Sequence, residues 1–188
     1  MQDYTCNVPP NLLEPYRNYL KVLAGSQMAV CLRAKVDESD LVQQTMLKAY
    51  VALNRAPLDN PNALAAWLRE ILANELADTF KRFNTGKRDI NLERSIAADL
   101  DRSSSGMEAW LAGDISTPSC IVEKRESIKR LSDAVVLLPD DMREVVVLKH
   151  LQGYSLLEVV EATGRTPASV AGLLRRGLAK LRELLEAK

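Results

Sequence analysis

The sequence predicts an all-α protein made of two helical domains joined by an acidic linker. Hydrophobic residues make up 47% of the chain and aromatic residues only 5%, and Leu and Ala dominate, which favours helices over strands. Apolar residues recur at helical spacing through most of the chain, and no segment has a convincing strand period. That periodicity weakens at residues 98–118, apart from a short apolar patch at 107–111, so we expect a linker there that is partly ordered at most.

The N-terminal half predicts three helices in succession. The first spans about residues 12–35, with a possible break at Gly25-Ser26, and the second spans 40–54, with Asp37 and Ser39 as candidate caps. The third opens at Asn60-Pro61 and runs to about Phe83, with a leucine or phenylalanine at every fourth position. These positions are Leu64, Leu68, Leu72, Leu76 and Phe80. The sequence Asn84-Thr85-Gly86 then predicts a helix end.

The C-terminal half resumes as helix near Ser119, and a further helix starts at Pro139 and closes at Gly153. Residues 154–182 then read as a helix-turn-helix. Ser155 and Glu158 have the spacing of a capping box, and Gly164 suits a turn that requires a left-handed residue. Thr166 is the expected cap of a second helix that begins at Pro167. An ordinary helical hairpin in a core is the alternative for this segment.

The second helix of this motif has two distinct faces at 100° per residue. One is an apolar stripe formed by Val170, Leu174, Leu178, Leu181 and Leu185. The other carries the candidate DNA contacts, which are Arg165, Thr166, Ala168, Ser169, Gly172, Arg175 and Arg176. Only Arg165, Thr166 and Ser169 can plausibly reach a base edge, so we expect mostly electrostatic affinity, with close backbone approach and thymine-methyl contacts adding discrimination. Glycine at positions 172 and 177 is explained by close approach of the helix backbone to DNA, or equally by tight packing against a neighbouring helix.

The helix expected at 60–83 offers a second surface. Asn74 and Asp78 share a side with Trp67, and a basic helix end follows. Such a surface can hold single-stranded nucleic acid by stacking and phosphate contacts. The alternative to a nucleic-acid site is an ordinary helix. In that case the tryptophan lies in the core, the polar edge faces solvent and the basic end complements the helix dipole. The candidate residues are Trp67, Asn74, Asp78, Lys81, Arg82, Lys87 and Arg88.

Charge is balanced overall but unevenly distributed. The chain has 25 basic and 25 acidic residues, yet residues 163–182 hold five basic residues and no acidic one.

Three scattered cysteines and one histidine leave little from which to build a disulfide frame or a zinc site. The sequence has no phosphate loop, nucleophile elbow or plausible Cys-His pair, so we expect no enzyme, no cofactor and no metal. With neither signal peptide nor membrane-length apolar run, a cytoplasmic protein without membrane insertion is expected.

Three segments together resemble the bacterial RNA polymerase sigma factors of the extracytoplasmic-function (ECF) group. They are DESDLVQQTMLKAY, AWLREILANELADTFKR and the stretch from LPDDMREVVVLKH to GLAKLRELL, in this order and spacing. The resemblance implies sigma domain 2 at residues 10–96, a linker at 97–119 and sigma domain 4 at 120–188. It implies a transcription initiation factor that binds core RNA polymerase, directs it to promoters and helps to melt the minus-ten element.

The resemblance also implies a role for each surface. The helix at 40–54 would dock on the β′ clamp helices through Leu41, Gln44, Leu47 and Lys48. The region from Trp67 to Arg88 would capture the non-template strand of the minus-ten element. The helix-turn-helix would read the minus-thirty-five element and contact the β flap, and the acidic linker would pass toward the active-site and RNA-exit channels. Two domains on a flexible linker would also permit clamping by an anti-sigma factor.

The chain departs from the commoner family pattern at the start of the recognition helix. Ala171, Gly172 and Leu173 stand where family members often carry lysine, serine and arginine, which weakens the expectation of direct base readout. A stand-alone helix-turn-helix repressor or activator is the main alternative. It would bind a palindromic site as a dimer, whereas a sigma factor binds polymerase one to one. A purely helical interaction protein would show no salt-dependent affinity for DNA.

Overall fold

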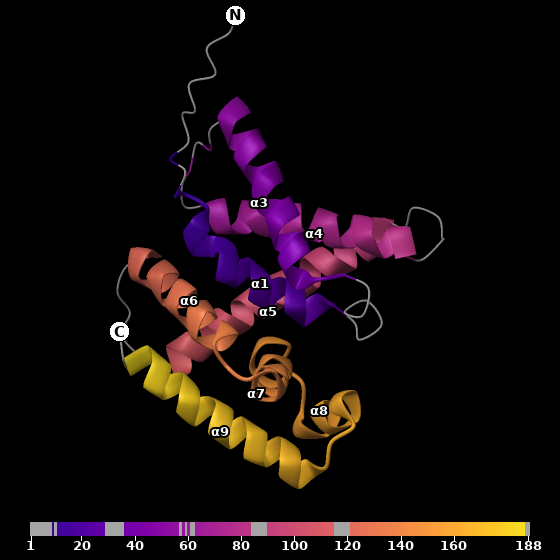
Figure 1. The fold of residues 1–188 in the computed structure, drawn as a ribbon, viewed down its shortest axis with the longest axis vertical. Coiled ribbons are helices and arrows are strands. Elements are labelled where there is room, and N and C mark those ends of the chain that lie inside the picture. Colours follow the sequence, from indigo (N-terminus) through magenta and orange to yellow (C-terminus); the bar gives the residue numbers. More distant parts are fainter. Residues whose placement is uncertain are drawn as a thin grey trace, which may run out of the picture. The chain divides into compact units, whose positions relative to one another are not determined.

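The computed structural model describes residues 9, 11–28, 36–56, 58, 60, 63–83, 90–114 and 121–186 (Figure 1). Within these ranges the chain forms helices and turns and no strand, which confirms the all-α prediction. It divides into two compact units, Met1–Leu100 and Asp101–Lys188. The assignment of sigma domains to residues 10–96 and 120–188 stays a prediction. No helix in the described ranges is long and apolar enough to cross a membrane.

The N-terminal unit is built around three mutually contacting helices. The short 3₁₀-helix η1 (Glu14–Tyr16) leads into α1 (Arg17–Gln27), followed by α3 (Glu38–Arg55) and α4 (Leu64–Phe83). The leucines at every fourth position of α4 are fully buried at Leu68, Leu72 and Leu76, as their spacing predicts. Since each contact is between amphipathic helices, burial of these apolar faces is the main stabilising term.

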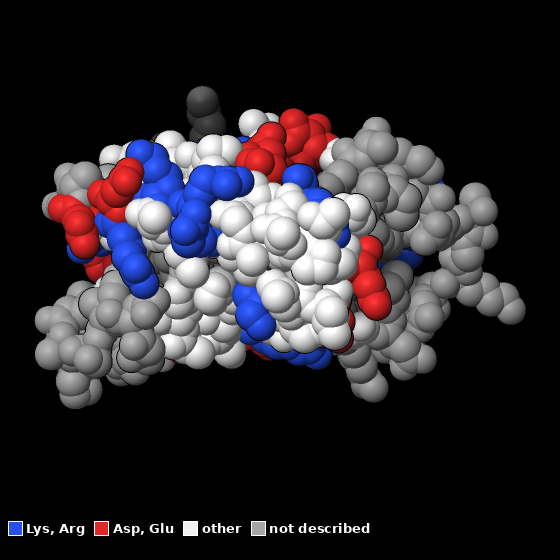
Figure 2. All heavy atoms as spheres, turned by 90° about the horizontal axis from the view of Figure 1, so that it is seen from below, with Lys and Arg blue, Asp and Glu red and all other residues white. Residues whose placement is uncertain are grey.

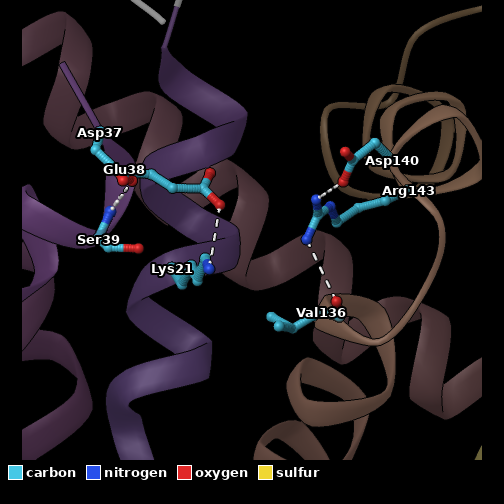
Figure 3. Close-up of polar contacts among 7 residues, drawn as sticks. All are labelled: Lys21, Asp37, Glu38, Ser39, Val136, Asp140 and Arg143. Atoms are coloured by element: carbon cyan, nitrogen blue, oxygen red, sulfur yellow. Dashed lines mark hydrogen bonds and ion pairs between the residues drawn. The ribbon is translucent and has the colours of Figure 1, made fainter.

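Polar contacts set where α3 starts and how it meets α1 (Figure 3). The Asp37 carboxylate accepts a hydrogen bond from the Ser39 backbone N–H at 2.8 Å, which makes Asp37 the cap and leaves Ser39 inside the helix. Glu38 pairs with Lys21 of α1 at 3.7 Å. α1 continues through Gly25 without a break, and a Cβ there would lie 2.6 Å from the Glu38 carboxylate. That carboxylate is the mobile end of a side chain, so the contact brings α1 near the start of α3 without requiring glycine at position 25.

The C-terminal unit contains α6 (Ile121–Val136), α7 (Asp140–Val146), the π-helix η3 (Val147–Leu151), α8 (Leu156–Thr163) and α9 (Pro167–Glu186). α9 contacts α6, α7 and α8. Pro139 is the residue that caps α7, one position before the helix, which agrees with the expected helix start. Arg143 fastens this start, because it pairs with the Asp140 carboxylate and donates to the Val136 carbonyl at 3.3 Å (Figure 3).

The prediction of a partly ordered linker is wrong for residues 97–114, the part of that segment which the structure describes. Residues 97–114 belong to the 25-residue helix α5 (Ile90–Asp114) rather than to a partly ordered segment. Ile96, Leu100 and Met107 are buried and share one helical stripe, and the small residues Ser103 and Ser104 fill the position between them. Serines and glycine suggest a loop when read along the sequence, but here their small size lets this helix lie close to its neighbours.

Candidate nucleic-acid interface

The turn of the helix-turn-helix has the caps that the sequence predicts. The Ser155 hydroxyl accepts from the Glu158 N–H at 3.2 Å, and the Glu158 carboxylate accepts from the Ser155 N–H at 2.7 Å, which completes the capping box. Gly164 ends α8 with a φ of 64°, in the left-handed region. The Thr166 hydroxyl accepts from the Ser169 N–H at 3.3 Å, and α9 begins at Pro167. The local geometry of this motif is confirmed.

The capping box makes α8 sensitive to acid. The hydrogen bond from the Ser155 backbone N–H, helped by the Ser155 hydroxyl, lowers the pKa of Glu158 below its ordinary value of 4.5. A lowered folded-state pKa contributes stability above the ordinary value and loses it as the pH falls through the folded-state value. We therefore expect Glu158→Gln to lower the melting temperature near pH 7, and we expect this difference from wild type to shrink as the pH falls below the ordinary pKa of 4.5. Circular dichroism melts measure this, and a pH-independent difference would contradict it.

One face of α9 is packed in the core of the C-terminal unit. Val170 and Leu173 join Val145 of α7 and Val159 of α8 in one buried cluster. Gly177 is also buried, and a Cβ there would lie 3.0 Å from a Val146 methyl group. The predicted stripe is confirmed as buried at Val170 and Leu181, whereas Leu174, Leu178 and Leu185 are half-buried. Leu173 was not predicted as a core residue, whereas tight helix packing was one of the two explanations expected for Gly177.

The opposite face of α9 is open. Thr166, Ala168, Ser169, Arg175 and Arg176 are exposed and Gly172 is half-buried. A Cβ on Gly172 would meet only the Arg176 guanidinium, at 3.5 Å, so close helix packing explains Gly177 and not Gly172. Figure 2, which views the structure from below Figure 1, shows basic side chains beside a broad uncharged surface, with acidic side chains at its edges. This arrangement suits phosphate contacts next to a close approach of backbone.

Arg165 differs from the other candidates. It is half-buried, and its guanidinium lies 3.6 Å from the Glu144 carboxylate of α7. This pair holds the side chain against α7. Thr166 and Ser169 are therefore the polar side chains most open to a base edge at the start of α9.

On α4, the predicted strand-binding residues share one side of the helix. Trp67, Asn74, Asp78 and Lys81 fall within roughly 60° of one another at 100° per residue. Asn74 and Asp78 are exposed, and Trp67 and Lys81 are half-buried. Asp78 pairs with Lys81 at 3.8 Å. Arg82 is also exposed, whereas Lys87 and Arg88 lie outside the described residues.

Only some of the residues predicted to dock on the polymerase lie on one exposed face of α3. Gln44 and Leu47 are exposed, with Leu47 at 59%, but Leu41 is buried in the core and does not reach this face. Val51, 42% exposed, lies one turn beyond Leu47 and extends the apolar ridge. Val51 was not predicted as part of this face, although its position four residues after Leu47 indicates that the two side chains are neighbours on the helix.

Lys48 has an intramolecular partner that sequence reasoning missed. Its ammonium pairs with Glu75 of α4, a carboxylate that is buried. Glu75 sits among the apolar positions of α4 beside Leu72 and Leu76, which was the available signal for a buried acid. Since a buried carboxylate is costly to leave unpaired, Lys48 serves the packing of α3 on α4.

Comparison with known proteins identifies the family. The model of the family described as Sigma-70, region 4 matches residues 128–181, which span most of α6 to α9. The RNA polymerase sigma factor CarQ of Myxococcus xanthus is 31% identical over 146 residues, covering 78% of this chain and 73% of CarQ. The chain belongs to the RNA polymerase sigma factors of the ECF group.

Two further relatives agree with this assignment. The RNA polymerase sigma factor CnrH of Cupriavidus metallidurans is 29% identical over 153 residues, covering 81% of this chain and 75% of CnrH. The ECF RNA polymerase sigma factor SigW of Bacillus subtilis is 26% identical over 149 residues, covering 79% of this chain and 75% of SigW. As a sigma factor, the protein directs RNA polymerase to promoters, and sigma factors are not enzymes. The choice between a sigma factor and a stand-alone repressor is thereby decided.

Proposed function

We propose that the two units of this sigma factor divide promoter recognition between three surfaces. The exposed ridge Gln44, Leu47 and Val51 of α3 docks on the β′ clamp helices of core polymerase. The Trp67, Asn74 and Asp78 side of α4 holds the non-template strand of the minus-ten element. The open face of α9 binds the minus-thirty-five element, and the C-terminal unit contacts the β flap. This activity places the protein in the cytoplasm.

The exposed side of α4 is the observation that carries the melting role. Unpaired bases must be held once they leave the stack, or pairing returns. Asn74 presents an amide, which can donate to and accept from a base edge, and the ring of Trp67 on the same side can stack on a base. Lys81 and Arg82 supply positive charge one turn further on, where the strand's phosphates would pass.

The open face of α9 supports binding that depends more on phosphates than on bases. Its first turns carry Ala168, Ala171 and Gly172, which have no long polar side chain, while Arg175 and Arg176 follow. Side chains of this kind permit close approach and methyl contacts, and arginines further along neutralise phosphates. Sequence discrimination at the minus-thirty-five element is therefore expected to be modest.

Transcription by purified core polymerase with this protein added, on a pool of genomic promoter fragments, tests the proposal. Transcript starts that appear only with the protein, and that share paired upstream elements, would support it and supply the promoter sequences. If the protein produces no new starts and does not co-elute with core polymerase, the proposed function is overturned.

Asn74→Ala tests the strand-capture role directly. Loss of one buried hydrogen bond to a base costs about 1–3 kcal/mol, so the polymerase complex should bind the single-stranded minus-ten oligonucleotide roughly tenfold more weakly. Its affinity for the duplex minus-thirty-five element should not change. Ala66→Ser, at an exposed position of the same helix, is the matched control. Equal affinity of Asn74→Ala and wild type for the single strand would contradict the assignment.

A further inference from the structure

Residues 101–114 of α5 pack within the C-terminal unit, against the end of η3. Met107, Ser103 and Ser104, which lie on this part of α5, are buried. The Trp110 ring stacks on the imidazole of His150, with centroids 4.6 Å apart and an interplanar angle of 16°. The Ser132 hydroxyl of α6 lies 4.0 Å from the Met107 sulfur, so this part of α5 also meets α6.

Gly106 is the point of closest approach. A Cβ on this residue would lie 2.7 Å from the Leu151 carbonyl oxygen and 3.0 Å from the His150 carbonyl oxygen. Both neighbours are backbone atoms, which cannot rotate away as a flexible side chain can. Carbonyls at the end of a helix lack the next intrahelical donor, and a glycine Cα–H can approach them where a larger residue cannot. Glycine is thus required here by contact rather than by backbone conformation.

The end of η3 leads directly into the helix-turn-helix. The Gln152 N–H donates to Val147 O at 3.1 Å, and the Tyr154 N–H donates to Leu148 O at 3.1 Å. Gly153 takes a φ of 75°, and Ser155 is already the cap of α8. Three residues therefore separate Leu151, whose backbone Gly106 approaches, from Ser155, the cap of α8.

The other end of this segment is fixed by the recognition motif itself. Val145 of α7 lies in the buried cluster with Val159 of α8 and with Val170 and Leu173 of α9. The helix formed by α7 and η3 is accordingly held by α8 and α9 through Val145, and by α5 at its C-terminal end.

We propose that residues 101–114 form a positioning helix for the helix-turn-helix: by docking on His150 and Leu151 they hold α8 and α9 in the orientation that binds duplex DNA. The inference rests on the proposed function of α9. Residues 101–114 are then part of the DNA-binding unit in function as well, because their docking sets the affinity of the C-terminal unit for the minus-thirty-five element.

Gly106→Ala in the full chain tests the docking, with Ser105→Ala as the matched control at the neighbouring exposed position. Alanine favours an ordinary helix interior over glycine, so an unconstrained site would be stabilised. We expect the opposite at Gly106. Hydrogen exchange at the amides of Gln152, Tyr154 and Val159 should become at least about tenfold faster, while α4 is unchanged and Ser105→Ala behaves as wild type. Unchanged or slower exchange in Gly106→Ala overturns the docking.

DNA affinity tests the positioning. The probe is a duplex minus-thirty-five element from the promoters found by transcription, at a temperature where circular dichroism shows each variant fully folded. Gly106→Ala and Trp110→Ala should bind several-fold more weakly than wild type, with an unchanged salt dependence because no charge is removed. Trp110→Phe keeps a ring for the stack and should recover most of the affinity.

The outcomes separate the two proposals. If wild type binds the duplex and Gly106→Ala and Trp110→Ala bind equally well, the positioning role is overturned and the proposed function stands. If wild type binds no duplex in the polymerase complex, the role of α9 is overturned, and the positioning role falls with it. Faster exchange, weaker binding and recovery in Trp110→Phe together establish the positioning helix.

Discussion

Leu47→Glu is expected to weaken binding to core RNA polymerase by roughly 30- to 1000-fold, which corresponds to about 2–4 kcal/mol. Leu47 is a large apolar side chain, 59% exposed, on the ridge that continues to Val51. A carboxylate at the centre of an apolar contact must lose its hydration without a partner. Co-elution with core polymerase and a competition assay against a reference sigma factor measure the effect.

Leu12→Glu is the matched control, since Leu12 is another exposed leucine of the N-terminal unit, at 39%. Glutamate is a good helix former and Leu12 lies before η1, outside any helix, so neither variant should change the helix content seen by circular dichroism. Equal loss of polymerase binding in both variants would point to a general charge effect. Wild-type binding by Leu47→Glu would remove the α3 ridge from the polymerase interface.

The double variant Arg175→Ala, Arg176→Ala is expected to lose on the order of 10- to 100-fold in affinity for the duplex minus-thirty-five element near physiological salt. Both guanidinium groups are exposed on the open face of α9. Each phosphate contact contributes a slope of about −0.9 to the plot of log affinity against log salt concentration, so that slope should become shallower by roughly two. Filter binding or fluorescence anisotropy at several salt concentrations measures both quantities.

Phosphate contacts carry no base information, so the loss should be about equal across promoter sequences. Either single variant should show the same uniformity with a smaller loss. Arg130→Ala removes one exposed guanidinium from α6, which donates to the Leu185 carbonyl at the far end of α9 at 2.8 Å, and should leave the slope nearly unchanged. A sharp change in sequence preference from Arg175→Ala or Arg176→Ala would contradict the assignment and place that arginine on a base edge.

The helix-turn-helix was predictable because its determinants are local. Ser155, Glu158, Gly164 and Pro167 act on backbone groups within three or four residues of themselves, so their spacing alone specifies the caps and the turn. The long apolar repeat of α4 is local in the same sense. Family resemblance added the order of the segments and the identity of the partners.

Tertiary packing set the limits of prediction. Leu173 and Gly177 are buried because α7 crosses α9 at these positions. Tight packing was one of two explanations for Gly177, and nothing in α9 itself indicates the burial of Leu173. For Leu41, the resemblance placed the side chain at the polymerase, whereas the structure buries it in the core of the N-terminal unit. The Lys48–Glu75 pair joins residues 27 positions apart, beyond the reach of periodicity.

The helix at residues 101–114 was missed for a different reason. Its buried face uses Ser103, Ser104 and Gly106, residues that favour turns when no neighbour is considered. Small residues become helix-packing residues only when another backbone lies against them. That neighbour, the end of η3, is more than forty positions away in the sequence, as the contact between Gly106 and Leu151 shows.

His150 is the only histidine of the chain, and its ring lies against the indole of Trp110. A proton NMR spectrum of the protein therefore contains a single set of imidazole signals. The ring current of a stacked indole displaces such signals from the positions of a free imidazole. The chain thus carries its own spectroscopic reporter at the junction of α5 and η3, readable without any attached label, in the free protein and in a complex with DNA.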